Sequence, residues 1–273
     1  MNEILQLPSI RNEKCWYLLS LFYAREKWAN LINEIKYFHQ EWKNQFSNCL
    51  ISFSGEKGEH LQVVFVAHHS DSSNYTDEIQ LHFQSFFEQN PSISSIPFPY
   101  GKAVWGNYPN NSLTWNKFKL PDYSDQYIDF HQKTMDVTLT LLTGDFSADS
   151  FFSVGMYLII KCLCCIDHNK QKNALNQALY ETSISSPHFV YTVKELTKEI
   201  DIHEVGEVIE SYRNEDANNY SPELIKWLNE VKNIMQRYSF ETLCTFFCKI
   251  VGLSGLRQLM ILELLNIWYN RIM

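Results

Sequence analysis

Residues 58–68, GEHLQVVFVAH, begin as a turn and continue as a run of apolar and β-branched side chains, which is typical of a strand. Successive side chains of a strand point to opposite faces, so His60 and Gln62 share one face, and Leu61 and Val63 share the other. The polar pair has two interpretations. It forms the floor of a pocket, or it lies on the exposed face of an antiparallel sheet, where polar side chains are ordinary.

The segments before this strand indicate a sheet covered by helices. Residues 48–55, NCLISFSG, precede the turn residues GEKGE and predict a β-hairpin with the strand that follows. Residues 15–23, CWYLLSLFY, predict another strand, and apolar residues at helical spacing follow it and recur in residues 76–90. We therefore expect an α+β fold, with an antiparallel sheet that includes residues 15–23, 49–54 and 60–67 and has packed helices.

The second half of the chain is predicted to be mostly helical. Segments that begin near Asp125 and Asp149 show helical periodicity, and the rest reads as several helices broken at residues 185–187 and 221–222. No sharp linker divides the sequence, so residues 1–273 are expected to form a single domain. Residues 91–121 predict a long loop with short strands and interleaved aromatic residues: Tyr100, Trp105, Tyr108 and Trp115.

Composition excludes several classes of function. The net charge of −8 and the scattered basic residues lack the electrostatic footprint of a nucleic-acid-binding protein, and favour neutral or basic partners. Nucleophile-elbow, Walker, zinc-protease and dinucleotide motifs are absent, so we expect no cofactor and no metal. The polar N-terminus and the lack of a membrane-length apolar run favour a cytoplasmic location.

Clusters of cysteine and acidic residues have two interpretations, as chemical sites or as structural features. Cys162, Cys164 and Cys165, with His168 nearby, suggest metal ligands, but a second ligand pair at loop spacing is missing. Cys244 and Cys248, one helical turn apart, fit small core side chains better. Acidic pairs on a polar helix, Glu207 with Glu210 and Glu215 with Asp216, are interpreted as solvating charge.

Several segments in order resemble a known family. They are Trp16-Tyr17-Leu18 through Phe22-Tyr23, residues 58–65 against a G-P-H-L-R-L-R-F pattern, residues 108–112 (YPNNS), and a closing Asn270-Arg271-Ile272. This order resembles the thiopeptide-type bacteriocin biosynthesis proteins, which are similar to the C-terminal glutamate-elimination domain of lantibiotic dehydratases. The resemblance covers nearly the whole chain.

The resemblance implies that the protein acts on a ribosomally made precursor peptide. Relatives remove glutamate from glutamylated Ser or Thr, and standalone relatives join two dehydroalanines into a six-membered ring. Elimination needs a cation for the departing carboxylate and a base for the α-proton. The family's strand arginines fall on Gln62 and Val64 here, a third arginine falls on Gln126, and a histidine falls on Asn266.

The site residues that the resemblance implies are accordingly mostly substituted. His60, Gln62, Gln126 and Asn266 occupy the catalytic positions. His60 is either the base or a structural residue that bonds a neighbouring backbone carbonyl. Substrate-binding positions are Tyr108, Asn110, Asn111, Tyr127 and Arg271.

Three functions stay open from the sequence. The first is maturation of a bacteriocin, lantipeptide or thiopeptide precursor, by glutamate elimination or by modification of dehydrated residues. The second is a non-catalytic partner of a separate glutamylating dehydratase, which the missing charged groups favour. The third is an unrelated α+β protein.

Overall fold

The computed structural model describes residues 9–11, 14–55, 58–67, 75–93, 108–115 and 118–272. The chain divides into two compact units, Met1–Met135 and Asp136–Met273. The first unit holds the sheet and the second is helical, which confirms the α+β prediction. The single-domain expectation stays a prediction. Two residues named above, Tyr100 and Trp105, lie outside the described ranges, as does the last residue of the stretch 58–68.

The described part of the first unit contains one antiparallel sheet of five strands. The strands are β1 (Ser9–Arg11), β2 (Lys14–Phe22), β3 (Phe46–Ser54), β4 (His60–Ala67) and β5 (Ser112–Trp115). Their order is β1-β2-β4-β3, and β5 pairs with β2. The predicted hairpin and the predicted first strand are therefore confirmed, and β5 is a short strand of the kind expected in residues 91–121.

A β-bulge in β3 changes the face to which its first residue points. The register between β3 and β4 shifts between Phe46 and Asn48, so Ser47 is an extra residue in β3. Phe46 thereby points to the same face as Phe65, and the two rings lie 5.2 Å apart. Without the bulge, strict alternation would direct the Phe46 side chain to the opposite face of the sheet.

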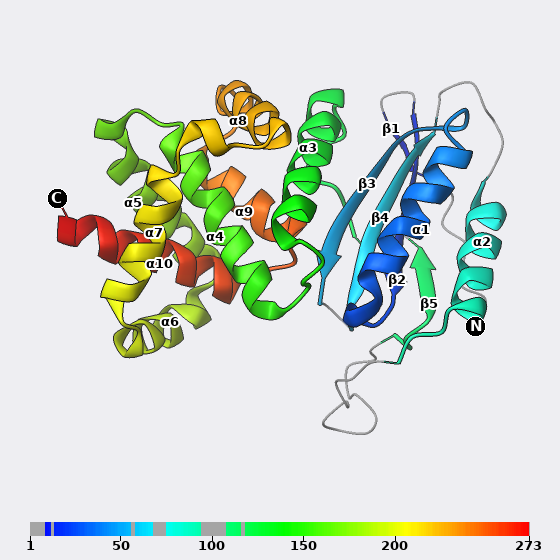
Figure 1. Ribbon diagram of the computed structural model, residues 1–273, viewed down its shortest axis with the longest axis horizontal. Helices are drawn as coiled ribbons and strands as arrows, with labels where there is room; N and C mark the ends of the chain where they lie inside the picture. The colour runs from blue at the N-terminus through cyan, green and yellow to red at the C-terminus, as the bar shows by residue number, and fades with distance from the viewer. Residues whose placement is uncertain are drawn as a thin grey trace. The chain divides into compact units, whose positions relative to one another are not determined.

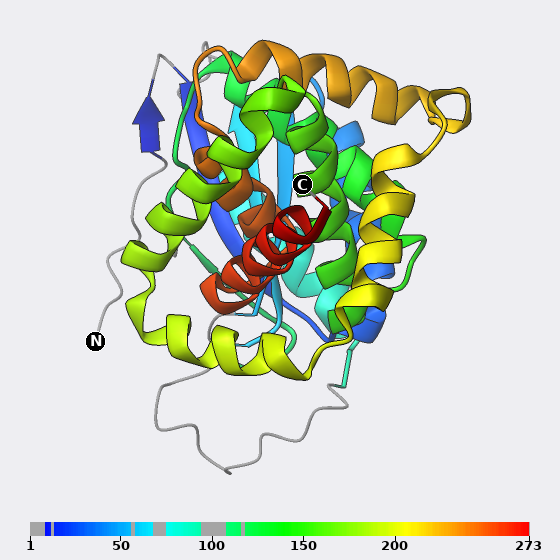
Figure 2. The same ribbon diagram turned by 90° about the vertical axis from the view of Figure 1, so that its left-hand side faces the viewer.

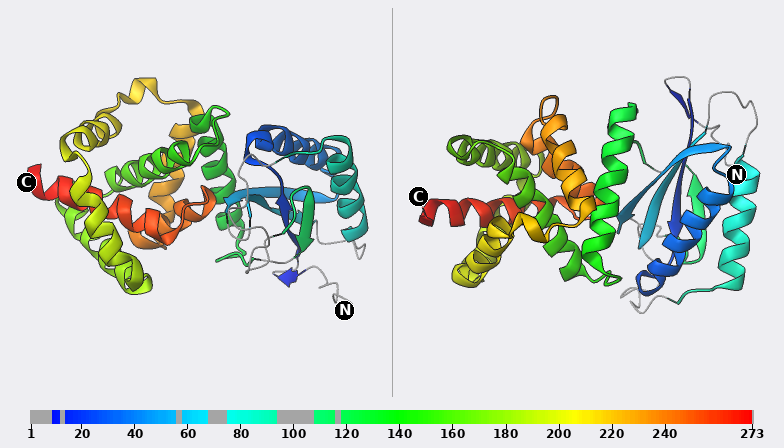
Figure 3. Two further views of the ribbon diagram at one scale, coloured as in Figure 1. Left: turned by 90° about the horizontal axis from the view of Figure 1, so that it is seen from below. Right: turned by 45° about the horizontal axis from the view of Figure 1, so that its top comes forward.

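An aromatic core fills the space between one face of the sheet and two helices, α1 (Trp28–Glu41) and α2 (Thr76–Gln89). A short 3-10 turn, η1 (Arg25–Lys27), precedes α1, and α2 follows β4. Figures 1 and 3 show both helices on the same side of the sheet. Phe38 of α1 is fully buried, and its ring lies 5.2 Å from that of Phe65 and 5.6 Å from that of Phe83. The helical spacing of apolar residues in both segments directs these rings to the sheet.

Helix α3 (Asp125–Leu142) begins at the residue where a helix was expected. The second unit continues with helices α4 (Ala148–Cys164), α5 (His168–Ser185), α6 (Pro187–Glu199), α7 (Ile202–Asn214), η2 (Ala217–Asn219), α8 (Pro222–Ile234), α9 (Phe240–Ile250) and α10 (Gly255–Ile272). Proline begins α6 and α8, as the predicted breaks require, because proline fits the first turn of a helix. Serine side chains cap three starts: Ser147, Ser221 and Ser239.

Helix α10 forms the centre of the second unit. It contacts α5, α6, α7 and α9, and Figure 2 shows it surrounded by these helices. Cys244 and Cys248 of α9 are both buried, which confirms them as core side chains. Among the helices of the described residues, none has the length and apolar character needed to cross a membrane.

Replacing Phe38 by alanine is expected to lower the free energy of unfolding by about 3–5 kcal/mol, because the ring fills the centre of the aromatic core. Urea denaturation followed by circular dichroism measures this loss. Tyr37→Ala is the matched control, since Tyr37 is 52% exposed on the same helix, and its effect should stay within about 0.5 kcal/mol. Equal losses in the two variants would contradict the assigned core.

Candidate functional site

The second face of the sheet carries a row of polar side chains. Thr114, Ser20, Gln62 and Ser52 are successive register partners across β5, β2, β4 and β3. Directly paired residues of antiparallel strands project to the same face, so the four side chains lie side by side. We call these four residues the polar row. Gln62 was predicted as a site residue from the sequence, whereas its three neighbours were not.

Apolar residues occupy the same face toward the other end of the strands. Leu18 pairs with Val64 and Val64 with Leu50, and each of these three side chains is buried. The face therefore changes from apolar to polar between Val64 and Gln62. The substituted family positions Gln62 and Val64 fall on the two sides of this boundary.

Helix α3 approaches the polar row and adds a histidine to it. His131 is buried, and its Nε2 lies 2.9 Å from the carbonyl oxygen of Ile51 and 3.2 Å from Oγ of Ser52. A carbonyl oxygen only accepts, so Nε2 carries the proton and donates to it. Burial lowers the pKa of His131 to about 4, so the imidazole is neutral at pH 7. The sequence alone did not point to this residue, although it lies one helical turn after Tyr127.

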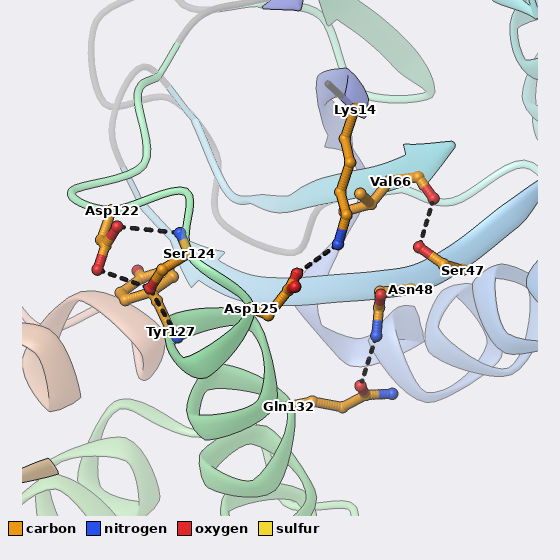
Figure 4. Close-up of polar contacts among 9 residues, drawn as sticks. All are labelled: Lys14, Ser47, Asn48, Val66, Asp122, Ser124, Asp125, Tyr127 and Gln132. Carbon is orange, nitrogen blue, oxygen red and sulfur yellow. Dashed lines mark hydrogen bonds and ion pairs between the residues drawn. The ribbon is translucent and has the colours of Figure 1, made fainter. Parts of the chain in front are cut away.

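Polar contacts tie the start of α3 to the strands (Figure 4). Lys14 of β2 forms an ion pair with Asp125, and the amide of Asn48 in β3 donates to Gln132 at 3.4 Å. The hydroxyl of Ser124 accepts from the backbone N–H of Tyr127 at 3.2 Å. These contacts hold the buried Tyr127 ring edge-on to His131, 5.8 Å between centroids. The half-buried Gln126 lies beside Tyr127 in the first turn of α3.

His60 begins β4 at the polar end of this face. It is only 4% exposed, so the exposed-face interpretation is wrong for this residue. Its Nδ1 lies 2.9 Å from the carbonyl oxygen of Gly58, which is the backbone contact expected of a structural histidine. Its ring lies 4.5 Å from that of Phe22, and the Tyr108 ring lies 4.8 Å from the same phenylalanine. Phe22 thus brings two of the predicted site residues together.

Asn110 and Asn111 use their side chains to hold the chain. Both amide nitrogens donate to the backbone oxygen of Ser92, at 2.7 Å and 2.9 Å, and the backbone N–H of Asn111 donates to Phe22 at 2.8 Å. Asn111 has a φ of 60°, a left-handed conformation that asparagine tolerates. The two asparagines therefore fasten the segment before β5 to the end of β2. Their predicted role in substrate binding stays a prediction.

The remaining predicted residues belong to the second unit. Asn266 of α10 accepts a hydrogen bond from the side chain of Asn270 at 3.2 Å, and Arg271 is exposed near the end of this helix. Of the three cysteines considered as metal ligands, Cys162 is a core side chain, because it is buried and burial raises the pKa of its thiol well above the usual value, whereas Cys164 is exposed. The described residues contain no group of three or more His, Cys, Asp or Glu side chains that could hold a metal ion.

Two hydroxyls of the polar row have no hydrogen bond to any described residue. Within the part of the chain that the structure describes, Ser20 Oγ and Thr114 Oγ1 are buried and have no hydrogen-bond partner. A buried hydroxyl without a partner costs about 1–3 kcal/mol. Such costs occur at functional sites more readily than in cores that only have to pack. The polar row is therefore our candidate functional site.

Comparison with solved structures identifies a protein of similar fold. The chain is similar to "Pyridine synthase, TbtD, from thiomuracin biosynthesis", with a TM-score of 0.62 and 12% sequence identity over 94% of this chain and 98% of that one. The likeness is one of fold. No family model matches the sequence, and a search of curated proteins finds no match to it.

Replacing Thr114 by valine is expected to raise the free energy of unfolding by about 1 kcal/mol, because the change removes a buried hydroxyl that has no hydrogen-bond partner among the described residues. Chemical denaturation measures the difference. The matched control is Thr134→Val, since the hydroxyl of Thr134 donates to the Phe130 carbonyl at 2.8 Å. The control should lose about 0.5–1.5 kcal/mol. If Thr114→Val lowered the stability instead, the Thr114 hydroxyl would have to make a stabilising hydrogen bond, and this result would contradict the prediction.

The burial of His131 makes stability depend on pH. Its folded pKa of about 4 lies below the unfolded value of 6.5, so the unfolded chain takes up the proton first as the pH falls. The stability that His131 contributes above pH 6.5 should be lost between pH 6.5 and 4, by about 3 kcal/mol in all. Denaturation at several pH values tests this. His131→Gln should flatten the curve in that range, and an unchanged slope would contradict a buried neutral imidazole.

Proposed function

We propose that this protein acts in the maturation of a ribosomally made, post-translationally modified peptide of the thiopeptide or lantipeptide type, and that it binds the precursor peptide at two partly exposed residues of the polar row, Gln62 and Ser52. The observation that carries this proposal is the likeness of fold to a pyridine synthase of thiomuracin biosynthesis, which extends over nearly all of both chains. One fold hosts many functions, so the chemistry depends on the residues of the site.

The side chains of the site favour an uncharged target. The polar row offers hydroxyl and amide groups, and His131 beside it is neutral at pH 7. Hydroxyls and amides match the N–H and C=O groups of a peptide but carry no charge to balance a departing carboxylate. This supports a substrate with dehydrated residues over one with glutamylated residues.

Glutamate elimination needs a cation and a base, and these residues are poorly suited to provide them. Gln62 and Gln126 occupy positions where relatives carry arginine, and neither side chain bears a charge. His60 would have to be the base. Its Nδ1 is engaged by the Gly58 carbonyl, so proton transfer would fall to Nε2 of a ring that is almost fully buried. Elimination is accordingly the less supported chemistry.

A non-catalytic role is the second candidate. The substitutions at Gln62, Val64, Gln126 and Asn266 favour it, because a protein that only presents a peptide to a separate dehydratase needs hydrogen bonds and pockets but no acid or base. Binding without turnover of either peptide form would support this role.

The test compares two forms of one precursor peptide, identified from the genes beside this one, with either a glutamylated or a dehydrated serine. The wild-type protein should bind the dehydrated form about tenfold more tightly and release no glutamate. Gln62→Arg should reverse this preference, since a charge-assisted hydrogen bond to the glutamyl carboxylate is worth about 1.5–3 kcal/mol. Calorimetry and mass spectrometry provide the two readouts.

Gln89→Arg is the matched control, because it adds the same charge at an exposed position of α2. Its preference should equal that of the wild type. Release of glutamate by the wild-type protein would overturn the preference for an uncharged target. Failure of the protein to bind either form at any salt concentration would overturn the peptide role itself.

A further inference from the structure

A buried lysine lies at the centre of a polar cluster in the second unit. The Lys161 side chain is 2% exposed, and its Nζ lies 3.0 Å from Oε2 of Glu215 and 2.6 Å from the hydroxyl of Tyr220. The ammonium group also lies 4.5 Å from the centroid of the Tyr220 ring and 5.3 Å from that of Tyr157. A buried charge needs a partner of opposite sign and hydrogen bonds, and Lys161 has both.

Glu215 is therefore not the solvating charge that the sequence suggested. It lies directly after α7, where Oε2 accepts from Lys161 and, at 2.7 Å, from the hydroxyl of Tyr157. Burial and this bond raise the pKa of Tyr157 above its usual value. The Glu215 side chain keeps 34% of its surface exposed. The carboxylate is thus fixed from one side and accessible from the other.

The accessible side of Glu215 faces a pocket of about 500 Å³. Its aromatic walls are Tyr157 and Tyr212, whose rings meet edge to face at 5.1 Å. Leu141 and Val154 contribute apolar surface, and the exposed Asp149 contributes a second carboxylate. All the lining residues belong to the second unit.

The charges around this pocket favour a cation. Asp149 and Glu215 contribute two negative charges and Lys161 one positive charge, which leaves one net negative charge. Lys161 is buried behind Glu215, so its ammonium group is not available to pair with an anion in the pocket. Aromatic faces beside carboxylates are the usual chemistry for binding ammonium and guanidinium groups. The apolar residues provide a surface for an aliphatic stem.

We propose that this pocket binds a basic side chain, an alkylammonium or guanidinium group on an aliphatic stem such as lysine or arginine provides. The carboxylates of Asp149 and Glu215 hold the cation, and the ring of Tyr212 with Leu141 and Val154 holds the stem. The pocket shares no residue with the polar row, so binding of a cation here is independent of the function proposed there. It gives the acidic protein a specific point of contact for a basic peptide segment.

The full chain is titrated with Nα-acetyl-lysine N-methylamide and Nα-acetyl-arginine N-methylamide, and binding is followed by NMR at low salt. Saturable binding of at least one of them is expected, with affinity that falls as salt is added. The uncharged counterparts, made from norleucine and citrulline, should bind about tenfold more weakly or not at all. Equal binding of charged and uncharged probes, or no saturable binding of either cation into the millimolar range, would overturn the proposal.

Two variants locate the binding. Asp149→Asn should weaken the cationic probe about threefold, as expected for an exposed ion pair, and Asp149 is exposed so the fold should persist. Glu210→Gln removes the same charge from an exposed position of α7 that does not line the pocket, and should leave the affinity unchanged. Equal losses in the two variants would show that only net charge matters, and that result would also overturn the proposal.

Discussion

The pairing of β2 with β4 determines what each face of the sheet can do. These strands are in register from Cys15 opposite Ala67 to Phe22 opposite His60, without a bulge between them. A shift of one residue would move every side chain of one strand to the opposite face. It would place Ser20 in the aromatic core and separate Gln62 from Ser20 and Thr114. Both the packing of α1 and α2 and the candidate site therefore depend on this register.

The two faces of the sheet differ in physical character. One face buries aromatic rings against two helices and supplies much of the apolar burial of the first unit. The other face buries uncharged polar groups, two of which have no hydrogen-bond partner within the described residues, and a histidine whose pKa burial lowers. Burial of these polar groups lowers the stability of the unit, and the apolar burial on the aromatic face can offset this loss. Hydroxyl, amide and neutral imidazole groups offer hydrogen bonds on this face but no charge.

In the second unit, a charge is buried among helices rather than beside a sheet. Lys161 projects from an otherwise apolar stretch of α4, and Glu215 and two tyrosines enclose it. Removing one partner of such a pair leaves an uncompensated charge, so the cluster restrains how α4 meets the segment after α7. The same cluster orients one carboxylate toward a pocket. A structural ion pair and a binding surface thus share the Glu215 side chain.

The sequence by itself determined the α+β class, the strands in residues 15–23, 49–54 and 60–67, the helical second half and its breaks at proline. These features depend on local periodicity and on residues with restricted backbone conformations, which neighbouring positions reveal. Alternation also placed His60 and Gln62 on one face. Only the tertiary structure decided which residues join them. Ser20, Ser52, Thr114 and His131 come from four segments, and strand register and helix packing bring them together across long sequence separations. The sequence did not predict the roles of Glu215 and Lys161 for the same reason, because burial and ion pairing are properties of the packed chain.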